Sequence, residues 1–202
     1  MKYDLSMDLV GRYLCHLIRK DPEDRPAAKK IRQEYREILL RASDIGSRNR
    51  LLSSYLLAAF FIAMNRCTGR TPEENIDLLQ NSMAHDRMLK LFMGDSKHYF
   101  SEKNMESRRV WARMTQDPAH QAQYPNDWVV SVVEKNGDFQ FGFDYHKCGV
   151  CNLCREEGCP GLAKYLCRLD DMLVGLMGLG LERTETLAEG GCRCDFRFLK
   201  NQ

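Results

Sequence analysis

The spacing of apolar residues changes near Asp117, and this change constrains the fold more than any other feature of the sequence. Before it, apolar positions recur at intervals of three and four residues, which is the period of amphipathic helices. After it, residues 128–135 are β-branched and aromatic, and residues 138–145 alternate between apolar and polar side chains. The Asn136-Gly137 pair between these runs is a strong signal for a hairpin turn. The sequence therefore predicts helices over residues 1–116, followed by a β-hairpin.

Two segments of the helical part are clearly delimited. Residues 51–64 carry no charge, but as a helix they would span only ~21 Å, less than the ~30 Å of a bilayer core. We expect them to form a buried core helix. Thr71, followed by Pro72 and Glu74, has the sequence of a capping box with proline in the first turn. The next helix should begin there and continue to about Phe92.

The C-terminal part adds one helix and two more strands. Pro160 opens a segment with an apolar stripe at helical spacing, and Gly178 ends it. Residues 181–188 and 192–199 resemble strands joined by a glycine turn at Gly190. We expect an α+β fold in which a helical N-terminal half precedes a four-stranded antiparallel sheet, ordered ββαββ and packed with helices on one face.

Length and composition fit one domain. The chain has 202 residues, of which 44% are hydrophobic and 29% charged, as is ordinary for a globular protein. We expect a single domain over residues 1–202, made of a helical part, 1–116, and an α+β part, 127–200, that contains a cysteine-rich loop.

The charge balance and the N-terminus exclude several classes of partner. Thirty Lys and Arg against 28 Asp and Glu give a net charge of +2, too little to indicate nucleic acid. The first twenty residues include acids and have no uninterrupted apolar run, unlike a secretory signal. We expect a cytoplasmic protein with a small-molecule substrate, without nucleic acid or membrane partners. A homodimer through the apolar helices stays open.

Five of the nine cysteines fall within residues 148–167. Because the reducing cytosol keeps thiols from forming disulfides, these cysteines should be packing residues, metal ligands or reactive groups. Short C-x-x-C spacings deliver thiolates to zinc or to an iron–sulfur cluster. The candidate ligands are Cys148, Cys151, Cys154 and Cys159. Alternatively, Cys151, Cys154 and Cys167 are small apolar core residues, so the cofactor is left unknown.

A second group of polar residues belongs to the last helix and strand. On a strand, Cys194 and Phe196 point one way while Asp195 and Arg197 point the other. Asp170 lies in mid-helix among leucines that turn inward. If it is partly buried it needs a partner such as Arg183 or Arg197, and a paired buried carboxylate in a pocket is a candidate functional group.

About the last eighty residues resemble the L-2-amino-thiazoline-4-carboxylic acid hydrolase family, and the ending, a glycine turn leading to Cys-Asp-Phe-Arg, is fairly specific. The residues that carry the resemblance are Cys148 to Gly158, Ala163, Cys167 to Asp170, Gly178, Leu181, Arg183, Thr184, Thr186, Ala188, Gly190 and Cys194 to Arg197. The helical first half matches only in type.

The resemblance implies a hydrolase that acts on a C–N bond of a small cyclic amidine and opens the ring to a carbamoyl-cysteine. Such chemistry needs a nucleophile, a proton-transfer group and a cation for the substrate carboxylate. We assign the catalytic roles to Cys194, Asp170 and Asp195, and substrate binding to Arg197 and Arg183. Cys194 would attack, or a cysteine-bound metal would activate water. The alternative is a non-catalytic small-molecule or metal/redox-binding module.

Overall fold

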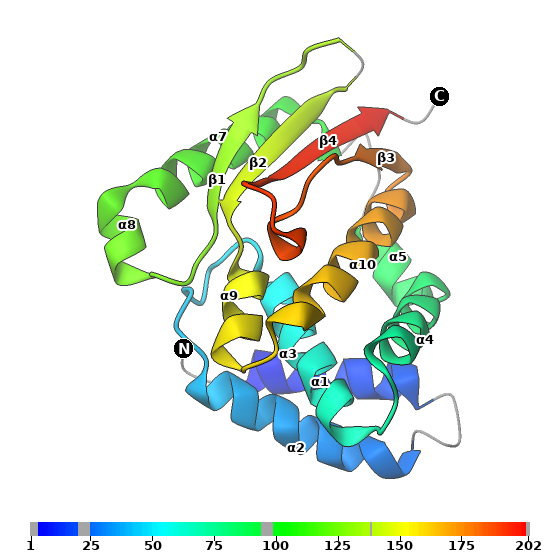
Figure 1. The fold of residues 1–202 in the computed structure, drawn as a ribbon. Helices are drawn as coiled ribbons and strands as arrows, with labels where there is room; N and C mark the ends of the chain where they lie inside the picture. The colour runs from blue at the N-terminus through cyan, green and yellow to red at the C-terminus, as the bar shows by residue number, and fades with distance from the viewer. Residues whose placement is uncertain (1–3, 20–24, 94–98, 138, 201–202) are drawn as a thin grey trace. The chain divides into compact units, whose positions relative to one another are not determined.

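The computed structural model describes residues 4–19, 25–93, 99–137 and 139–200 (Figure 1). The chain divides into two compact units. The first contains Met1–Asp86 and Val150–Leu166, and the second contains Arg87–Gly149 and Cys167–Gln202. The predicted α+β class is confirmed, with helices throughout the N-terminal half and a four-stranded antiparallel sheet in the C-terminal half.

The first unit is helical, and its core is built around α3. Its long helices are α1 (Leu5–Ile18), α2 (Arg25–Arg41), α3 (Leu52–Cys67) and α4 (Pro72–Ala84). Every residue of α3 from Ala58 to Met64 is buried, as expected for the uncharged segment. Among the described residues, no helix is both long and apolar enough to cross a membrane.

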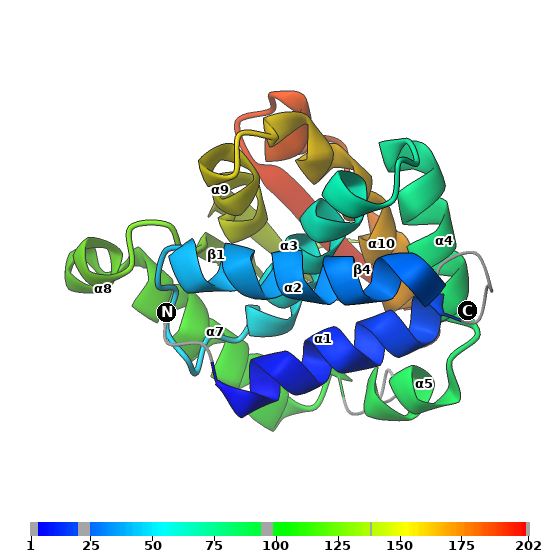
Figure 2. The ribbon, with the colours of Figure 1, turned by 90° about the horizontal axis from the view of Figure 1, so that it is seen from below.

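Helices α1 and α2 lie side by side (Figure 2). Their close approach depends on Gly11, because a Cβ atom there would lie 2.6 Å from the ring of Tyr35. The Tyr35 hydroxyl is buried and donates a 3.0 Å hydrogen bond to the carbonyl of Met7. This bond satisfies a polar group that would otherwise be costly inside the core.

The capping box predicted at Thr71 is present. The Thr71 side chain accepts a hydrogen bond from the Glu74 N–H, and the Glu74 carboxylate accepts one from the Thr71 N–H. The helix ends earlier than predicted, at Ala84, and a separate helix, α5, covers Arg87–Met93. The break coincides with Asp86, whose carboxylate accepts a 2.7 Å hydrogen bond from the hydroxyl of Tyr13.

The second unit holds the sheet, whose strand order is β1-β2-β4-β3. The strands are β1 (Val129–Val133), β2 (Phe141–Lys147), β3 (Leu179–Glu182) and β4 (Cys194–Lys200), and all neighbours are antiparallel. The predicted hairpin is therefore confirmed as β1 and β2. An isolated bridge pairs Asn136 with Phe139, and Asp138 between them lies outside the described residues.

One face of the sheet is aromatic and is covered by α7 (Glu102–Gln116). The Trp111 ring of α7 packs edge-on against Phe143, with ring centroids 5.7 Å apart. Phe196 and Phe198 of β4 contact the aromatic side chains of β2 on the same face. The short α8 (Pro118–Gln123) lies between α7 and β1 in the chain.

Two local predictions were wrong. The cysteine-rich segment is not a loop but begins with a helix, α9 (Gly149–Glu156), followed by α10 (Ala163–Leu176). The strand predicted over residues 181–188 is displaced, because β3 ends at Glu182 and Leu187–Glu189 forms a 3-10 turn. The backbone N–H groups of Thr184 and Glu185 donate to a side chain, that of Asp195, instead of to a neighbouring strand.

Candidate functional site

An ion pair joins α10 to the end of β3. The guanidinium of Arg183 donates to the Asp170 carboxylate through Nη1 at 2.9 Å, and through Nη2 to the carbonyl of Cys167 at 3.1 Å and to the carboxylate of Asp171 at 3.3 Å. The same guanidinium lies 5.1 Å from the ring centre of Phe196. Of the two partners predicted for Asp170, the structure selects Arg183.

The environment of Asp170 favours its neutral form. Burial raises the pKa of Asp170 to about 7, although the charge and hydrogen bond of Arg183 oppose this rise. The Asp170 side chain remains 36% exposed, so water still reaches it. A carboxyl group that gains and loses a proton near neutral pH is suited to general acid and base catalysis.

Cys194 begins β4 on the aromatic face, paired with Tyr145 of β2. Its thiol is buried, and its sulfur accepts a 3.2 Å hydrogen bond from the backbone N–H of Leu187. Burial raises the pKa of Cys194 to about 11, and the Leu187 hydrogen bond opposes this only in part. Cys194 is therefore a neutral thiol at pH 7 and not a preformed thiolate.

Two further side chains, those of Tyr145 and Cys167, share the surroundings of Cys194 and Asp170. Burial raises the pKa of Tyr145 and of Cys167, and the charges of Asp170, Cys148 and Cys194 raise each of them further. The group therefore combines thiols and a phenol, held in their neutral forms near pH 7, with one carboxyl whose pKa of about 7 leaves it poised between its two forms. We call Asp170, Arg183, Cys194, Tyr145 and Cys167 the α10 cluster. Tyr145 was missed from the sequence, although the alternation of β2 placed it on the face of Phe143.

Asp195 points away from this cluster and anchors the segment between β3 and β4. Its carboxylate accepts hydrogen bonds from the Thr184 N–H and the Glu185 N–H, each at 2.8 Å, and from the Thr184 hydroxyl at 2.6 Å. Burial alone would raise the pKa of Asp195, but these hydrogen bonds outweigh it and lower that pKa. Asp195 is 6% exposed and its acceptors are already occupied.

Arg197 also lies on the face opposite Cys194. Its Nη2 donates to Asp144 at 2.8 Å, and its Nη1 donates to the carbonyls of Phe143 and Phe196. Arg193 forms a second ion pair with Asp144 at 3.3 Å. The structure therefore divides the predicted site residues between two faces: Cys194, Asp170 and Arg183 on one, Asp195 and Arg197 on the other.

The four cysteines predicted to bind metal lie on and around α9. Cys151 and Cys154 belong to this helix, Cys148 precedes it and Cys159 follows it. None of the nine cysteines, all of which the structure describes, forms a disulfide. Across residues 4–19, 25–93, 99–137 and 139–200, no group of three or more His, Cys, Asp or Glu side chains is placed to hold a metal ion. The geometry gives no support to the four-cysteine metal site.

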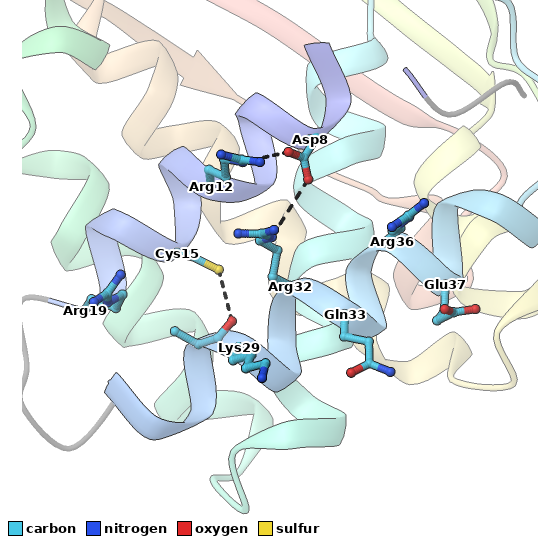
Figure 3. Close-up of a pocket in the computed structure, with 10 residues that line it drawn as sticks. Asp8, Arg12, Cys15, Arg19, Lys29, Arg32, Gln33, Arg36 and Glu37 are labelled. Atoms are coloured by element: carbon cyan, nitrogen blue, oxygen red, sulfur yellow. Dashed lines mark hydrogen bonds and ion pairs between the residues drawn. The ribbon is translucent and has the colours of Figure 1, made fainter. Parts of the chain in front are cut away.

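The first unit contains a basic pocket of about 860 Å³ between α1 and α2 (Figure 3). Its cationic side chains are Arg12, Arg19, Lys29, Arg32 and Arg36. Asp8 pairs with Arg12 at 2.6 Å and lies 3.8 Å from Arg32, and the buried Cys15 thiol donates to the carbonyl of Ala28. An excess of cations in a hollow attracts small anions. Sequence reasoning missed this pocket, because the bases of the two helices face each other only after folding.

The comparison with protein families identifies the family of this chain. The model of L-2-amino-thiazoline-4-carboxylic acid hydrolase matches residues 49–198. This chain belongs to the L-2-amino-thiazoline-4-carboxylic acid hydrolase family. No curated protein and no solved structure matches it.

The family match divides the described sites. All residues of the α10 cluster lie within residues 49–198, as do Asp195 and Arg197. The residues of the basic pocket lie between Asp8 and Glu37, before the matched range begins. Family membership in the L-2-amino-thiazoline-4-carboxylic acid hydrolases therefore bears on the α10 cluster and not on the pocket.

Proposed function

We propose that this protein hydrolyses a small cyclic amidine carboxylate of the aminothiazoline type and opens the ring at a C–N bond. The observation that carries this proposal is the Asp170–Arg183 pair on the same face of the sheet as the neutral thiol of Cys194, inside the range shared with the hydrolase family. The pair supplies a group for proton transfer and a cation for a carboxylate, which are two of the requirements of the reaction.

Arg183 would bind the carboxylate of the substrate. Within the described residues, its hydrogen bonds to Asp170, Cys167 and Asp171 use three of the five N–H donors of a guanidinium. The remaining donors, which include Nε–H, are available to a ligand. Arg183 suits this role better than Arg197, because Arg197 lies on the opposite face of the sheet and already bonds Asp144.

Asp170 would move the proton. As carboxylate, it takes a proton from water while the water oxygen forms a bond to the amidine carbon. The electron pair of the C=N bond moves to the ring nitrogen, which takes the proton back from Asp170 and completes the tetrahedral adduct. As the ring C–N bond then breaks, Asp170 takes the proton of the adduct's hydroxyl, which becomes a carbonyl, and passes it to the departing nitrogen. The pKa of about 7 supports both steps, since the group is poised between its two forms near neutral pH.

Water is the preferred nucleophile over Cys194. A thiol whose pKa is raised to about 11 has a very small thiolate fraction at neutral pH. In this scheme Cys194 forms a wall of the site, and Asp195 holds the adjacent segment. The two schemes differ in the effect of Cys194→Ser, which removes a covalent pathway completely but leaves direct attack by water in place.

The test uses the full chain with 2-amino-thiazoline-4-carboxylate, and carbamoyl-cysteine is quantified by liquid chromatography and mass spectrometry. Asp170→Asn should lower kcat/KM by about 10² or more, the usual contribution of a general base. Arg183→Lys should chiefly raise KM. Glu182→Gln, an exposed neighbour on β3, is the matched control and should behave as wild type. Cys194→Ser should retain measurable turnover.

Two results would contradict this function. Full activity in Asp170→Asn would remove Asp170 from the reaction. No turnover by the wild-type chain, together with calorimetric binding of the thiazoline that Arg183→Lys weakens, would favour the alternative of a non-catalytic small-molecule-binding module.

A further inference from the structure

The helix α9 ends in a turn that brings two cysteines together. The N–H of Cys159 donates to the carbonyl of Cys154 at 2.8 Å, and the N–H of Gly158 donates to the carbonyl of Arg155 at 3.1 Å. Gly158 has a φ of +70°. These two hydrogen bonds around a left-handed glycine define a Schellman motif, which is frequently accompanied by a contact between the side chains of its first and last residues.

In this motif the contacting residues are both cysteines. The thiols of Cys154 and Cys159 are hydrogen-bonded to each other. The 2.8 Å backbone hydrogen bond between the two residues and the hydrogen bond between their thiols hold the two sulfurs close together before oxidation.

The two thiols differ in access. Cys154 is completely buried, whereas Cys159 is partly exposed at the end of the turn. A small oxidant can reach Cys159 from solvent. Cys154 needs no access of its own, because its partner lies beside it.

Ion pairs hold the turn in place. Glu157, between the two cysteines, has a side chain only 4% exposed and accepts hydrogen bonds from Arg41 at 2.6 and 2.9 Å and from Arg66 at 2.7 Å. Arg66 also donates to the backbone carbonyl of Glu157 at 2.7 Å. Because these contacts fix the turn in the reduced protein, forming a bond between the two sulfurs requires little further ordering.

We propose that Cys154 and Cys159 form a site of reversible oxidation, which a hydroperoxide converts to an intramolecular disulfide. Cys159, as thiolate, attacks the peroxide and becomes a sulfenic acid, and the peroxide O–O bond breaks to release water or an alcohol. The Cys154 thiol then attacks the Cys159 sulfur, an S–S bond forms, and the second oxygen leaves as water. Two thiols lose two electrons, and the peroxide gains them. A small dithiol returns the pair to the reduced state by exchange.

The chain offers a direct way to map this bond. Trypsin cleaves after Lys147, Arg155 and Lys164, so it separates Cys154, in peptide 148–155, from Cys159, the only cysteine of peptide 156–164. Full-length protein is treated with hydrogen peroxide, its remaining thiols are alkylated, and it is digested without reduction. We expect the two peptides to appear as one cross-linked species whose fragments place the bond at Cys154, and dithiothreitol should separate them.

Three variants complete the test. Cys159→Ser should abolish the linked species. Cys154→Ser should abolish it and leave Cys159 as a sulfenic acid that dimedone labels. Cys151→Ser, one turn earlier on α9, is the matched control and should leave the link intact. Thermal unfolding shows whether each variant is folded. The peptide map of the wild-type protein tests the proposal even if a variant fails to fold.

Three outcomes would overturn the proposal. They are a link from Cys159 to Cys148 or Cys151, peroxide treatment that leaves Cys154 and Cys159 fully alkylated, and stoichiometric zinc in elemental analysis whose removal by a chelator is needed before either thiol reacts. None of these readouts involves the thiazoline, so the proposal can fail or hold independently of the hydrolase activity.

Discussion

Replacing Asp195 by alanine tests whether this residue is a structural anchor or a catalytic acid. Its carboxylate accepts three hydrogen bonds, from the N–H and hydroxyl of Thr184 and from the N–H of Glu185. The residue is 6% exposed, so water cannot readily replace the lost acceptor. Asp195→Ala leaves two backbone donors without partners.

The expected loss follows from those two donors. A buried polar group left without a partner costs about 1–3 kcal/mol, and two such groups together should lower the free energy of unfolding by about 3 kcal/mol. For a chain of this length, that loss corresponds to a fall in Tm of roughly 6–12 °C. Asp195→Asn keeps one acceptor oxygen and should cost less than half as much.

The assay is urea denaturation followed by circular dichroism, with Glu182→Ala, an exposed residue of β3, as the control for mutation of an acid. Because the pKa of Asp195 is lowered in the folded state, its stabilisation is complete above the unfolded pKa of about 3.9 and is lost as the pH falls through the folded value. The difference between wild type and Asp195→Ala should therefore shrink below about pH 4. A change under about 1 kcal/mol at pH 7, with loss of turnover, would refute the anchoring role.

Two further predictions concern activity and packing. If Asp170 acts as the base, kcat/KM should rise with pH through about 7, because the carboxylate is the active form of a group whose pKa is raised to that value. A flat profile from about 1.5 pH units below that value to about 1.5 units above it would contradict this role. Gly11→Ala should lower the free energy of unfolding by about 1–3 kcal/mol, since its Cβ would meet the Tyr35 ring at 2.6 Å. Gly161→Ala, where nothing lies within 4 Å of the added Cβ, is its control in thermal unfolding, and equal Tm values for the two variants would argue against the predicted clash.

The features that were predictable from the sequence are those set by local chemistry. Thr71 and Glu74 form the capping box because all its atoms lie within one helical turn. The hairpin of β1 and β2 follows from alternation and a turn signal. The strand period also placed Cys194 and Asp195 on opposite faces of β4 before any partner was known.

Of the features that were missed, helix α9 had a local signal, whereas the partner of Asp170 depends on contacts distant in the sequence. A C-x-x-C spacing fits a metal loop, but it is also the i, i+3 spacing of a helix. Gly158, with a positive φ just after Glu156, is typical of a helix C-terminus and favours the helix. Asp170 had two candidate partners, Arg183 and Arg197. The register of β3 pairs Glu182 with Arg197, so that the next residue, Arg183, lies on the face of the sheet where it bonds Asp170 of α10. No local sequence pattern predicts the register of β3 against β4.

The anchor at Asp195 also bears on the order in which the second unit folds. Its hydrogen bonds close a segment of only ten or eleven residues, whereas the β2–β4 pairing joins Phe141 to Phe198. The entropy lost on closing a loop grows with its length. We therefore expect the β3–β4 segment to form first, and β2 to pair with β4 afterwards. In pulse-labelling hydrogen exchange, the Thr184 and Glu185 amides should then gain protection earlier than the amides of β2.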